Sequence, residues 1–188
     1  MNKEETKIIT IGASGVNITK RLKEKLKGNY KYICIQSNKN ISKQSVADVN
    51  LLINKEGLGA GGNIAKGRFW AQEFEEEIKE AINSNNEIII VAALGGGTTS
   101  GAMPVIAKYA KELNLNAHII ALIPFSFEGE RRTERAFTSI EEAKLYSDNI
   151  TIISNNIILE KVEKQTTLKE AFNIVDEIII SKIKEIIW

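Results

Sequence analysis

Residues 87–101 read EIIIVAALGGGTTSG, an apolar run that ends in three consecutive glycines and a cluster of hydroxyl side chains. A short, continuous apolar run bounded by turn residues is typical of a parallel strand covered on both faces. Residues 102–113 (AMPVIAKYAKEL) follow with helical periodicity, and we expect Pro104 in the first turns, where a missing N–H costs little. The stretch therefore predicts a buried strand, a glycine loop and a helix.

The same alternation continues in both directions along the chain. Further β-branched runs predict strands at 7–11, 30–36, 49–53, 117–123 and 149–153. Apolar residues spaced by three and four predict helices at 16–27, 64–83, 130–146 and 167–188. Strands that alternate with helices imply right-handed crossovers and a parallel sheet with helices on both faces. The predicted fold class is α/β, with the parallel sheet sandwiched by helices.

Composition narrows the classes of function. The 188 residues include 25 Lys and Arg against 24 Asp and Glu, so no excess of positive charge favours nucleic acid or an anionic membrane. The single cysteine, Cys34, excludes an intrachain disulfide. No apolar run approaches the ~20 residues of a membrane span, and the N-terminus (MNKEETK) lacks the apolar segment of a signal peptide. We expect a cytoplasmic protein that neither binds nucleic acid nor inserts into a membrane.

Glycine is concentrated in four short groups, which hold twelve of the 13 glycines. Three of the groups follow predicted strands, at the edge of a parallel sheet where ligands bind. Glycine lets the backbone approach an anion with successive N–H groups aimed at it, and a helix N-terminus adds a favourable potential. The pattern predicts phosphate-binding loops, although neither a Walker A loop nor G-x-G-x-x-G occurs in the sequence.

Four stretches together resemble the FtsZ and tubulin family. GGGTTSG at 95–101 is similar to the tubulin-family signature GGGTGTG, and GLGAGGN at 57–63 resembles the third loop of FtsZ. PFSFEGERR at 124–132 is similar to the PFxFEGxxR stretch of FtsZ, and AFNIVDE at 171–177 resembles the start of its central helix. Because the four occur in the family's order and at its separations, the resemblance implies a Rossmann-like domain that binds GTP or GDP, with Mg²⁺ as the candidate metal.

The resemblance also implies which residues bind the nucleotide. They are Ala13, Ser14, Gly15, Asn17, Gly59, Ala60, Gly61, Gly95, Gly96, Gly97, Thr98, Thr99, Ser100, Gly101, Glu128, Arg132, Asn155, Phe172 and Asp176. The loop from Ala13 to Gly15 would contact the phosphates, and Gly97 to Thr99 would cradle the β-phosphate, with Arg132 nearby. These roles are expectations from the family.

The base and ribose are assigned to side chains in the same way. Asn17 would reach guanine, and Glu128 would accept a hydrogen bond from the ribose. Phe172 would stack on the base, and Asp176 would accept from guanine N1 and N2, a pair of donors that adenine does not present. Core packing is the alternative for Phe172, and a solvated position on a helix is the alternative for Asp176.

Several positions depart from the family pattern. The first loop is shorter than in FtsZ. Thr99 stands where the family has glycine, an unfavourable choice if the backbone there needs a positive φ. Gln36-Ser37-Asn38 stands where FtsZ has Asn-Thr-Asp, which removes a carboxylate near the metal. Of the residues 154–157, only Asn155 keeps its family role.

The resemblance divides the chain into a GTP-binding domain, 1–166, and a terminal helix of the central type, 167–188, packed on it. In FtsZ and tubulin a second domain follows, and an acidic loop there positions the hydrolytic water in the next subunit. These 188 residues lack that loop, and a general base is typically worth about 10²–10⁴-fold, so we expect weak or no autonomous GTP hydrolysis. The segment 178–188 holds six isoleucines and Trp188, which cannot all face one sheet, so we expect an exposed patch there for a second copy or a full-length FtsZ-like protein.

The leading interpretation is thus a GTP-binding, FtsZ-like protein of the cell-division or cytoskeletal class. The alternative is an interaction module or filament-end regulator that kept the fold and lost its ligand, which the departures at Thr99 and Asn38 favour. An NAD-type oxidoreductase on a similar sheet has less support, because no acidic residue follows the second strand.

Overall fold

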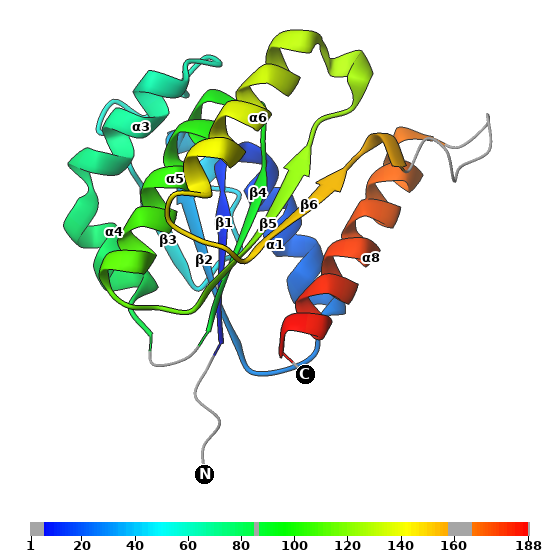
Figure 1. Cartoon of the computed structure of the whole chain (residues 1–188), viewed down its shortest axis with the longest axis horizontal. Helices are drawn as coiled ribbons and strands as arrows, with labels where there is room; N and C mark the ends of the chain where they lie inside the picture. Colours follow the sequence, from blue (N-terminus) through cyan, green and yellow to red (C-terminus); the bar gives the residue numbers. More distant parts are fainter. Residues whose placement is uncertain (1–5, 85–86, 158–166, 188) are drawn as a thin grey trace.

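Six parallel strands form the centre of the fold, in the order β3-β2-β1-β4-β5-β6 (Figure 1). The computed structural model describes residues 6–84, 87–157 and 167–187. The strands are β1 (Thr6–Ile11), β2 (Tyr30–Gln36), β3 (Val49–Leu52), β4 (Ile88–Ala93), β5 (Ala117–Ile123) and β6 (Ile150–Ser154). The predicted strands are therefore confirmed to within one residue at each end.

Helices cover both faces of this sheet. They are α1 (Gly12–Lys25), α2 (Lys39–Ser42), α3 (Ile64–Glu73), α4 (Glu75–Ile82), α5 (Gly97–Glu112), the short 3₁₀ helix η1 (Ser126–Glu128), α6 (Glu130–Ala143) and α8 (Leu168–Ile187). One layer holds α3, α4, α5 and α6, and the opposite layer holds α1 and α8 (Figure 1). The predicted α/β class is confirmed.

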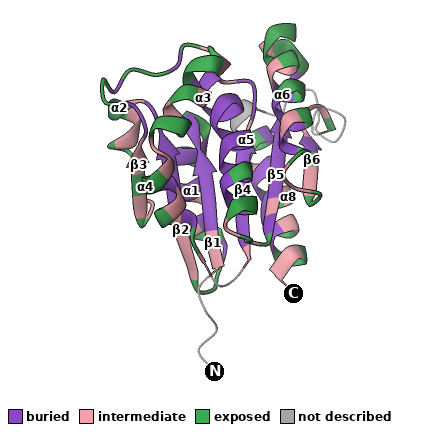
Figure 2. Cartoon of the chain, turned by 60° about the vertical axis from the view of Figure 1, so that its left-hand side comes forward, coloured by how far each residue is buried: buried purple, intermediate pink, exposed green. Residues whose placement is uncertain are grey.

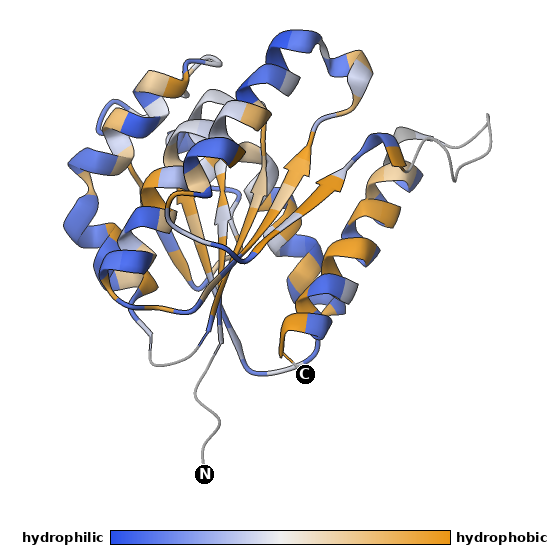
Figure 3. Cartoon of the chain, in the orientation of Figure 1, coloured by the Kyte–Doolittle hydropathy of each residue, from blue (hydrophilic) through white to orange (hydrophobic). Residues whose placement is uncertain are grey.

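The core has two halves, one on each face of the sheet. Ile8 packs with α1 and α8, whereas its neighbour Ile9 packs with α4 and α5, as the two-residue period of a strand requires. Both isoleucines are fully buried. The central strands are buried and apolar, while the outward faces of the helices are exposed and hydrophilic (Figures 2 and 3). Because both faces of these strands are buried, nearly every residue in them is apolar.

Two helix predictions differ from the structure. The predicted helix 64–83 is two helices, α3 and α4, separated at Phe74, whose φ of −105° and ψ of 33° interrupt the helical backbone. α5 begins at Gly97, earlier than predicted, so Pro104 lies in the helix interior. Because proline has no N–H to donate to the carbonyl of Ser100, the helix lacks one hydrogen bond there. The predicted position of Pro104 in the first turns of the helix was wrong.

The isoleucines of α8 are not an exposed patch in this chain. Ile179 and Ile183 are fully buried, and Ile178, Ile186 and Ile187 are half-buried against the core beneath α1 and the sheet. The predicted patch over the described part of 178–187 is therefore wrong, because β5 and α1 together cover more of the helix than one sheet face does. Trp188 lies outside the described residues. No described helix is long and apolar enough to cross a membrane.

Candidate functional site

A groove of two adjoining cavities lies at the carboxyl ends of β1, β4 and β5. We call the first the charged cavity, of about 140 Å³, lined by Ser14, Asn17, Ile18, Arg21, Ala93, Leu94, Leu122, Pro124, Glu128, Arg132, Asn155, Phe172, Val175 and Asp176. We call the second the glycine cavity, of about 190 Å³, lined by Gly12, Ala13, Ser14, Gln36, Ser37, Asn38, Ile41, Gly59, Ala60, Gly61, Ala93, Gly96, Gly97, Thr98, Thr99 and Arg132. They share Ser14, Ala93 and Arg132, so they form one continuous groove.

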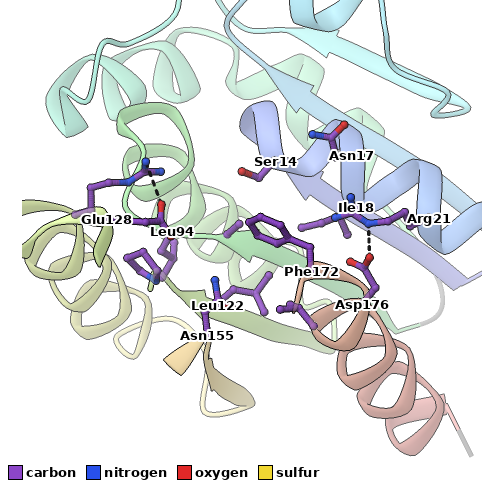
Figure 4. Close-up of a pocket in the computed structure, with 14 residues that line it drawn as sticks. Ser14, Asn17, Ile18, Arg21, Leu94, Leu122, Glu128, Asn155, Phe172 and Asp176 are labelled. Carbon is purple, nitrogen blue, oxygen red and sulfur yellow. Dashed lines mark ion pairs between the residues drawn. The ribbon is translucent and has the colours of Figure 1, made fainter. Parts of the chain in front are cut away.

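A buried ion pair joins the first and last described helices in the charged cavity. Nε of Arg21, on α1, pairs with Oδ2 of Asp176, on α8, and Asp176 is only 1% exposed (Figure 4). Burial raises the pKa of the Asp176 carboxyl, and the neighbouring Arg21 charge opposes that rise without cancelling it. Asp176 is therefore a buried carboxylate at a cavity wall, and the solvated alternative for it does not hold.

Phe172 lies one helical turn before Asp176 and lines the same cavity. Its residue exposure is 37%, and its ring meets Phe125 edge to face, with centroids 5.7 Å apart. Phe125 is fully buried and in turn stacks on Phe127 at 4.9 Å. Phe172 therefore lies at the rim of the cavity, in contact with Phe125, and is not a core residue.

Polar side chains complete the charged cavity on the side of β5 and β6. Glu128 accepts a hydrogen bond from the Phe125 N–H at 3.0 Å and forms an ion pair with Arg132 at 3.1 Å (Figure 4). Asn155, 7% exposed, follows β6, and its Oδ1 has no hydrogen-bond partner among the described residues. A buried acceptor without a partner is uncommon and marks a place where a ligand N–H or O–H would fit.

The glycine cavity lies where the N-termini of α1 and α5 come together. Gly12 begins α1 with a φ of +76°, and a Cβ there would lie 2.2 Å from Oγ1 of Thr99. Gly96 caps α5, and a Cβ on it would meet nothing within 4 Å, so the cavity is open above it. The first N–H groups of each helix lack partners within that helix, which makes this end of the groove suited to an anion.

The hydroxyl groups of the GGGTTSG segment organise the segment itself. Thr99 donates to the Ile11 carbonyl at 3.1 Å, and Thr98 shares a hydrogen bond of 2.6 Å with Ser37. The Ser100 hydroxyl accepts from the Gly95 N–H at 2.8 Å. Thr99 lies within α5 and has no positive φ, so the strain considered for this position does not arise.

Four residues expected at the nucleotide do not line the groove: Gly15, Gly95, Ser100 and Gly101. Gly101 faces α3, where an added Cβ would lie 2.3 Å from the Ile64 carbonyl oxygen and 2.6 Å from the backbone nitrogen of Arg68. A Cβ on Gly15 would lie 3.1 Å from the Thr10 backbone. These glycines permit close packing of helices and strand, whereas the other expected residues lie along the groove.

The sequence-based site assignment missed several groove residues, among them Arg21 and Ser37. Arg21 lies four residues after Asn17, on the same face of α1, so helical spacing alone placed it beside the expected base contact. Ser37 pairs with Thr98 across the cavity from β2, and no local pattern predicts that contact.

The donor set at the glycine cavity does not fit a protein-held Mg²⁺. Mg²⁺ in nucleotide sites is usually held by one or two carboxylates as well as phosphates and water. The lining side chains of this cavity include no carboxylate. Within residues 6–84, 87–157 and 167–187, no group of three or more His, Cys, Asp or Glu side chains is placed to hold a metal ion.

Comparisons with known proteins agree with the fold. Residues 5–163 match the family model described as Tubulin/FtsZ family, GTPase domain. The chain is 33% identical to an empty FtsZ dimer structure from M. jannaschii, with a TM-score of 0.86 over 97% of this chain and 55% of that one. GDP-bound CetZ1 from Haloferax volcanii is 23% identical over 94% of this chain and 58% of that one, with a TM-score of 0.77, which supports the fold. The chain thus spans a little over half the length of these relatives.

Proposed function

Because the chain belongs to the tubulin/FtsZ family of GTPase domains, we propose that its groove binds a guanine nucleotide, GTP or GDP. The base occupies the charged cavity and the phosphates occupy the glycine cavity. The observation that carries the proposal is the buried carboxylate of Asp176, ion-paired to Arg21 and one turn from the half-exposed ring of Phe172.

The charged cavity has the groups that guanine requires. Guanine presents two adjacent donors, N1–H and the N2 amine, and an ionised carboxylate is the natural acceptor for both. The Arg21 ion pair engages Oδ2 of Asp176 and fixes the carboxylate at the cavity wall. Phe172 offers a ring face for stacking, which is worth ~1–3 kcal/mol per base in nucleic-acid-binding proteins. The unpartnered Oδ1 of Asn155 supplies one further acceptor.

The glycine cavity has the features of a phosphate site. Two helix N-termini point into it, and Arg132, which lines both cavities, brings a guanidinium next to the same space. Gly96 leaves room for a phosphate to approach the backbone. Under this proposal 1–166 supplies the phosphate and ribose contacts and the base contacts of Asn17 and Asn155, and the helix at 167–188 supplies the base contacts of Phe172 and Asp176.

Isothermal titration of the chain with GTP, GDP, ATP and guanosine tests the proposal. We expect GTP and GDP to bind more tightly than ATP, and Asp176→Ala to remove that preference with a loss of ~1.5–3 kcal/mol for guanine ligands. Glu177→Ala is the matched control, since this neighbouring carboxylate is 72% exposed in its side chain. Tight, selective ATP binding would refute the guanine assignment, and no nucleotide binding would favour the interaction module that lost its ligand.

We also propose that the chain associates with a second family member through the surface around the groove. Large apolar side chains are exposed beside it: Leu58, next to the lining residue Gly59, is 66% exposed, and Phe127, next to the lining residue Glu128, is 63% exposed. Exposed apolar surface of this kind marks interaction sites. Sedimentation of the chain at high concentration, with and without GTP, tests this, and a persistent monomer in both conditions would contradict self-association.

Slow hydrolysis by these 188 residues stays a prediction, as do a cell-division role and a cytoplasmic location. A turnover assay on the chain checks the first of them. Rates equal to those of a full-length relative would show that the groups described here suffice for hydrolysis.

A further inference from the structure

Gln36, the last residue of β2, has a buried amide NH₂ group without a hydrogen-bond partner among the described residues. The residue is 1% exposed and lines the glycine cavity. Its Oε1 accepts from the N–H groups of Ser37, at 2.9 Å, and Asn38, at 3.4 Å. Because both of these partners are donors, the atom that faces them is the oxygen, and the NH₂ group is the opposite end of the amide. That Nε2 has no partner among the described residues.

An unpartnered buried N–H₂ group is costly unless a ligand or water satisfies it. The cavity beside Gln36 has no carboxylate to accept its hydrogen bonds. The nearby hydroxyls of Ser37 and Thr98 already bond to each other, at 2.6 Å. An anionic ligand with oxygen acceptors, such as a phosphate chain, would satisfy the amide.

Asn38, which also lines the glycine cavity, likewise carries no negative charge. It stands where FtsZ has Asp, and its Oδ1 is used to cap α2, accepting from the N–H groups of Asn40 at 2.9 Å and Ile41 at 3.2 Å. No lining side chain of the glycine cavity therefore offers the carboxylate that would anchor a divalent cation. The positive potential comes from Arg132 and from two helix N-termini.

We propose that Gln36 donates its amide to a phosphate oxygen of the bound nucleotide, and that neutral donors take the place of a protein-anchored divalent cation in this cavity. The inference rests on the proposed nucleotide function. Gln36 then contributes affinity for the phosphates and none for the base, and the phosphate contacts do not depend on metal.

Substitution of Gln36 tests the donor. Gln36→Glu keeps an oxygen to accept from Ser37 and Asn38 and replaces the NH₂ group by a second oxygen, whereas Gln36→Met removes both ends. We expect GTP and GDP to bind about tenfold more weakly or worse in both variants, as for a lost hydrogen bond to a charged group, while guanosine binds as in the wild type. An equal loss for guanosine would show that Gln36 acts only through the fold, and unchanged GTP affinity would overturn the proposal.

The statement that phosphate binding does not depend on metal has its own test, which does not require the Gln36 variants to fold. The wild-type affinity for GTP, titrated in EDTA and in MgCl₂, should differ by less than about twofold. Asn38→Asp keeps an oxygen to cap α2 and adds the absent carboxylate, so this variant should gain a preference for MgCl₂. Wild-type binding that is lost in EDTA would overturn the statement that phosphate binding does not depend on metal.

The same titrations separate failure of this inference from failure of the proposed function. A wild-type chain that binds neither guanosine nor GTP refutes the guanine-nucleotide proposal. A wild-type chain that binds both, with Gln36 variants that bind GTP equally well, refutes only the role of Gln36.

Discussion

The two cavities of the groove are built by different means. The charged cavity relies on side chains, with the Arg21–Asp176 and Arg132–Glu128 ion pairs at its walls and Phe172 at its rim. The glycine cavity relies on backbone, with two helix N-termini and glycines that permit close approach. Among the described residues, Arg132 is the only charged one that lines it.

This difference predicts that the charged cavity determines nucleotide selectivity and that the glycine cavity determines nucleotide affinity. Side-chain charge discriminates one base from another, because donors and acceptors differ among bases. Backbone N–H groups recognise any phosphate. A change in the charged cavity should therefore alter which nucleotide binds, and a change in the glycine cavity should alter how tightly all nucleotides bind.

The largest expected effect is at a glycine outside the groove, where α5 crosses α3 behind the glycine cavity. Gly101→Ala places a Cβ 2.3 Å from the Ile64 carbonyl oxygen, a backbone atom that cannot rotate away, so α3 and α5 must separate. We expect the free energy of unfolding to fall by about 3 kcal/mol, measured by urea denaturation. Gly96→Ala is the control, since its Cβ would meet nothing within 4 Å. Equal losses in the two variants would contradict this account.

The next largest effect is expected from the protonation of Asp176 in the charged cavity. Burial raises the pKa of Asp176, so on acidification this carboxylate is protonated at a higher pH than an ordinary aspartate. Guanosine affinity should fall with pH through that pKa, by about tenfold per pH unit below it, because only the ionised form accepts from both guanine donors. Titration of guanosine binding against pH measures this, without interference from phosphate protonation.

Arg21 supplies the matched variant for the pH profile. Arg21→Met removes the charge that favours the ionised carboxylate, so the pKa of Asp176 should rise further and the loss of guanosine binding should begin at a higher pH. A profile identical to that of the wild type would show that Asp176 does not control binding.

A smaller effect is expected from the hydroxyl pair of the glycine cavity. Thr98→Val removes the 2.6 Å hydrogen bond and leaves the buried Ser37 hydroxyl without its partner, at a cost of about 1 kcal/mol in unfolding free energy. Thr138→Val is the control, since that hydroxyl is exposed and bonds only within α6. Urea denaturation of both variants checks the difference, and an equal change in the two would contradict it.

The smallest effect concerns the solvent-accessible ion pair of the charged cavity. Glu128→Gln keeps an acceptor for the Phe125 N–H and weakens the pair with Arg132, whose side chain is 44% exposed. We expect a change of about 0.5 kcal/mol or less in unfolding free energy. A loss several times larger, measured by the same denaturation, would show that this pair stabilises the fold more than a solvent-accessible ion pair is expected to.

The fold was predictable because its strands are specified locally. Runs such as 88–93 are β-branched and apolar along their whole length, so no long-range information is needed to place them. The start of α5 was not predictable in this way. Three glycines favour a loop on intrinsic propensity, but the crossing with α3 stabilises helix from Gly97 onward, and that crossing depends on residues about 30 positions earlier.

The site was predictable where a family motif marks it and less so elsewhere. Phe172 and Asp176 lie together in the charged cavity as expected, whereas Ser100 and Gly101 belong to the packing of α5. The unpartnered amide of Gln36 follows from how β2 ends against its neighbours, which no sequence pattern encodes.

The ion pair between α1 and α8 has a consequence for the order in which the protein matures. Arg21 and Asp176 lie far apart in the sequence, so under the proposed function a nascent polypeptide on the ribosome would have the residues of the phosphate site long before it has those of the base site. Nucleotide at a hundredfold excess over its Kd would stabilise the chain by about 2.7 kcal/mol only after α8 has emerged and docked. Nucleotide binding would therefore favour nascent chains that have been translated through α8.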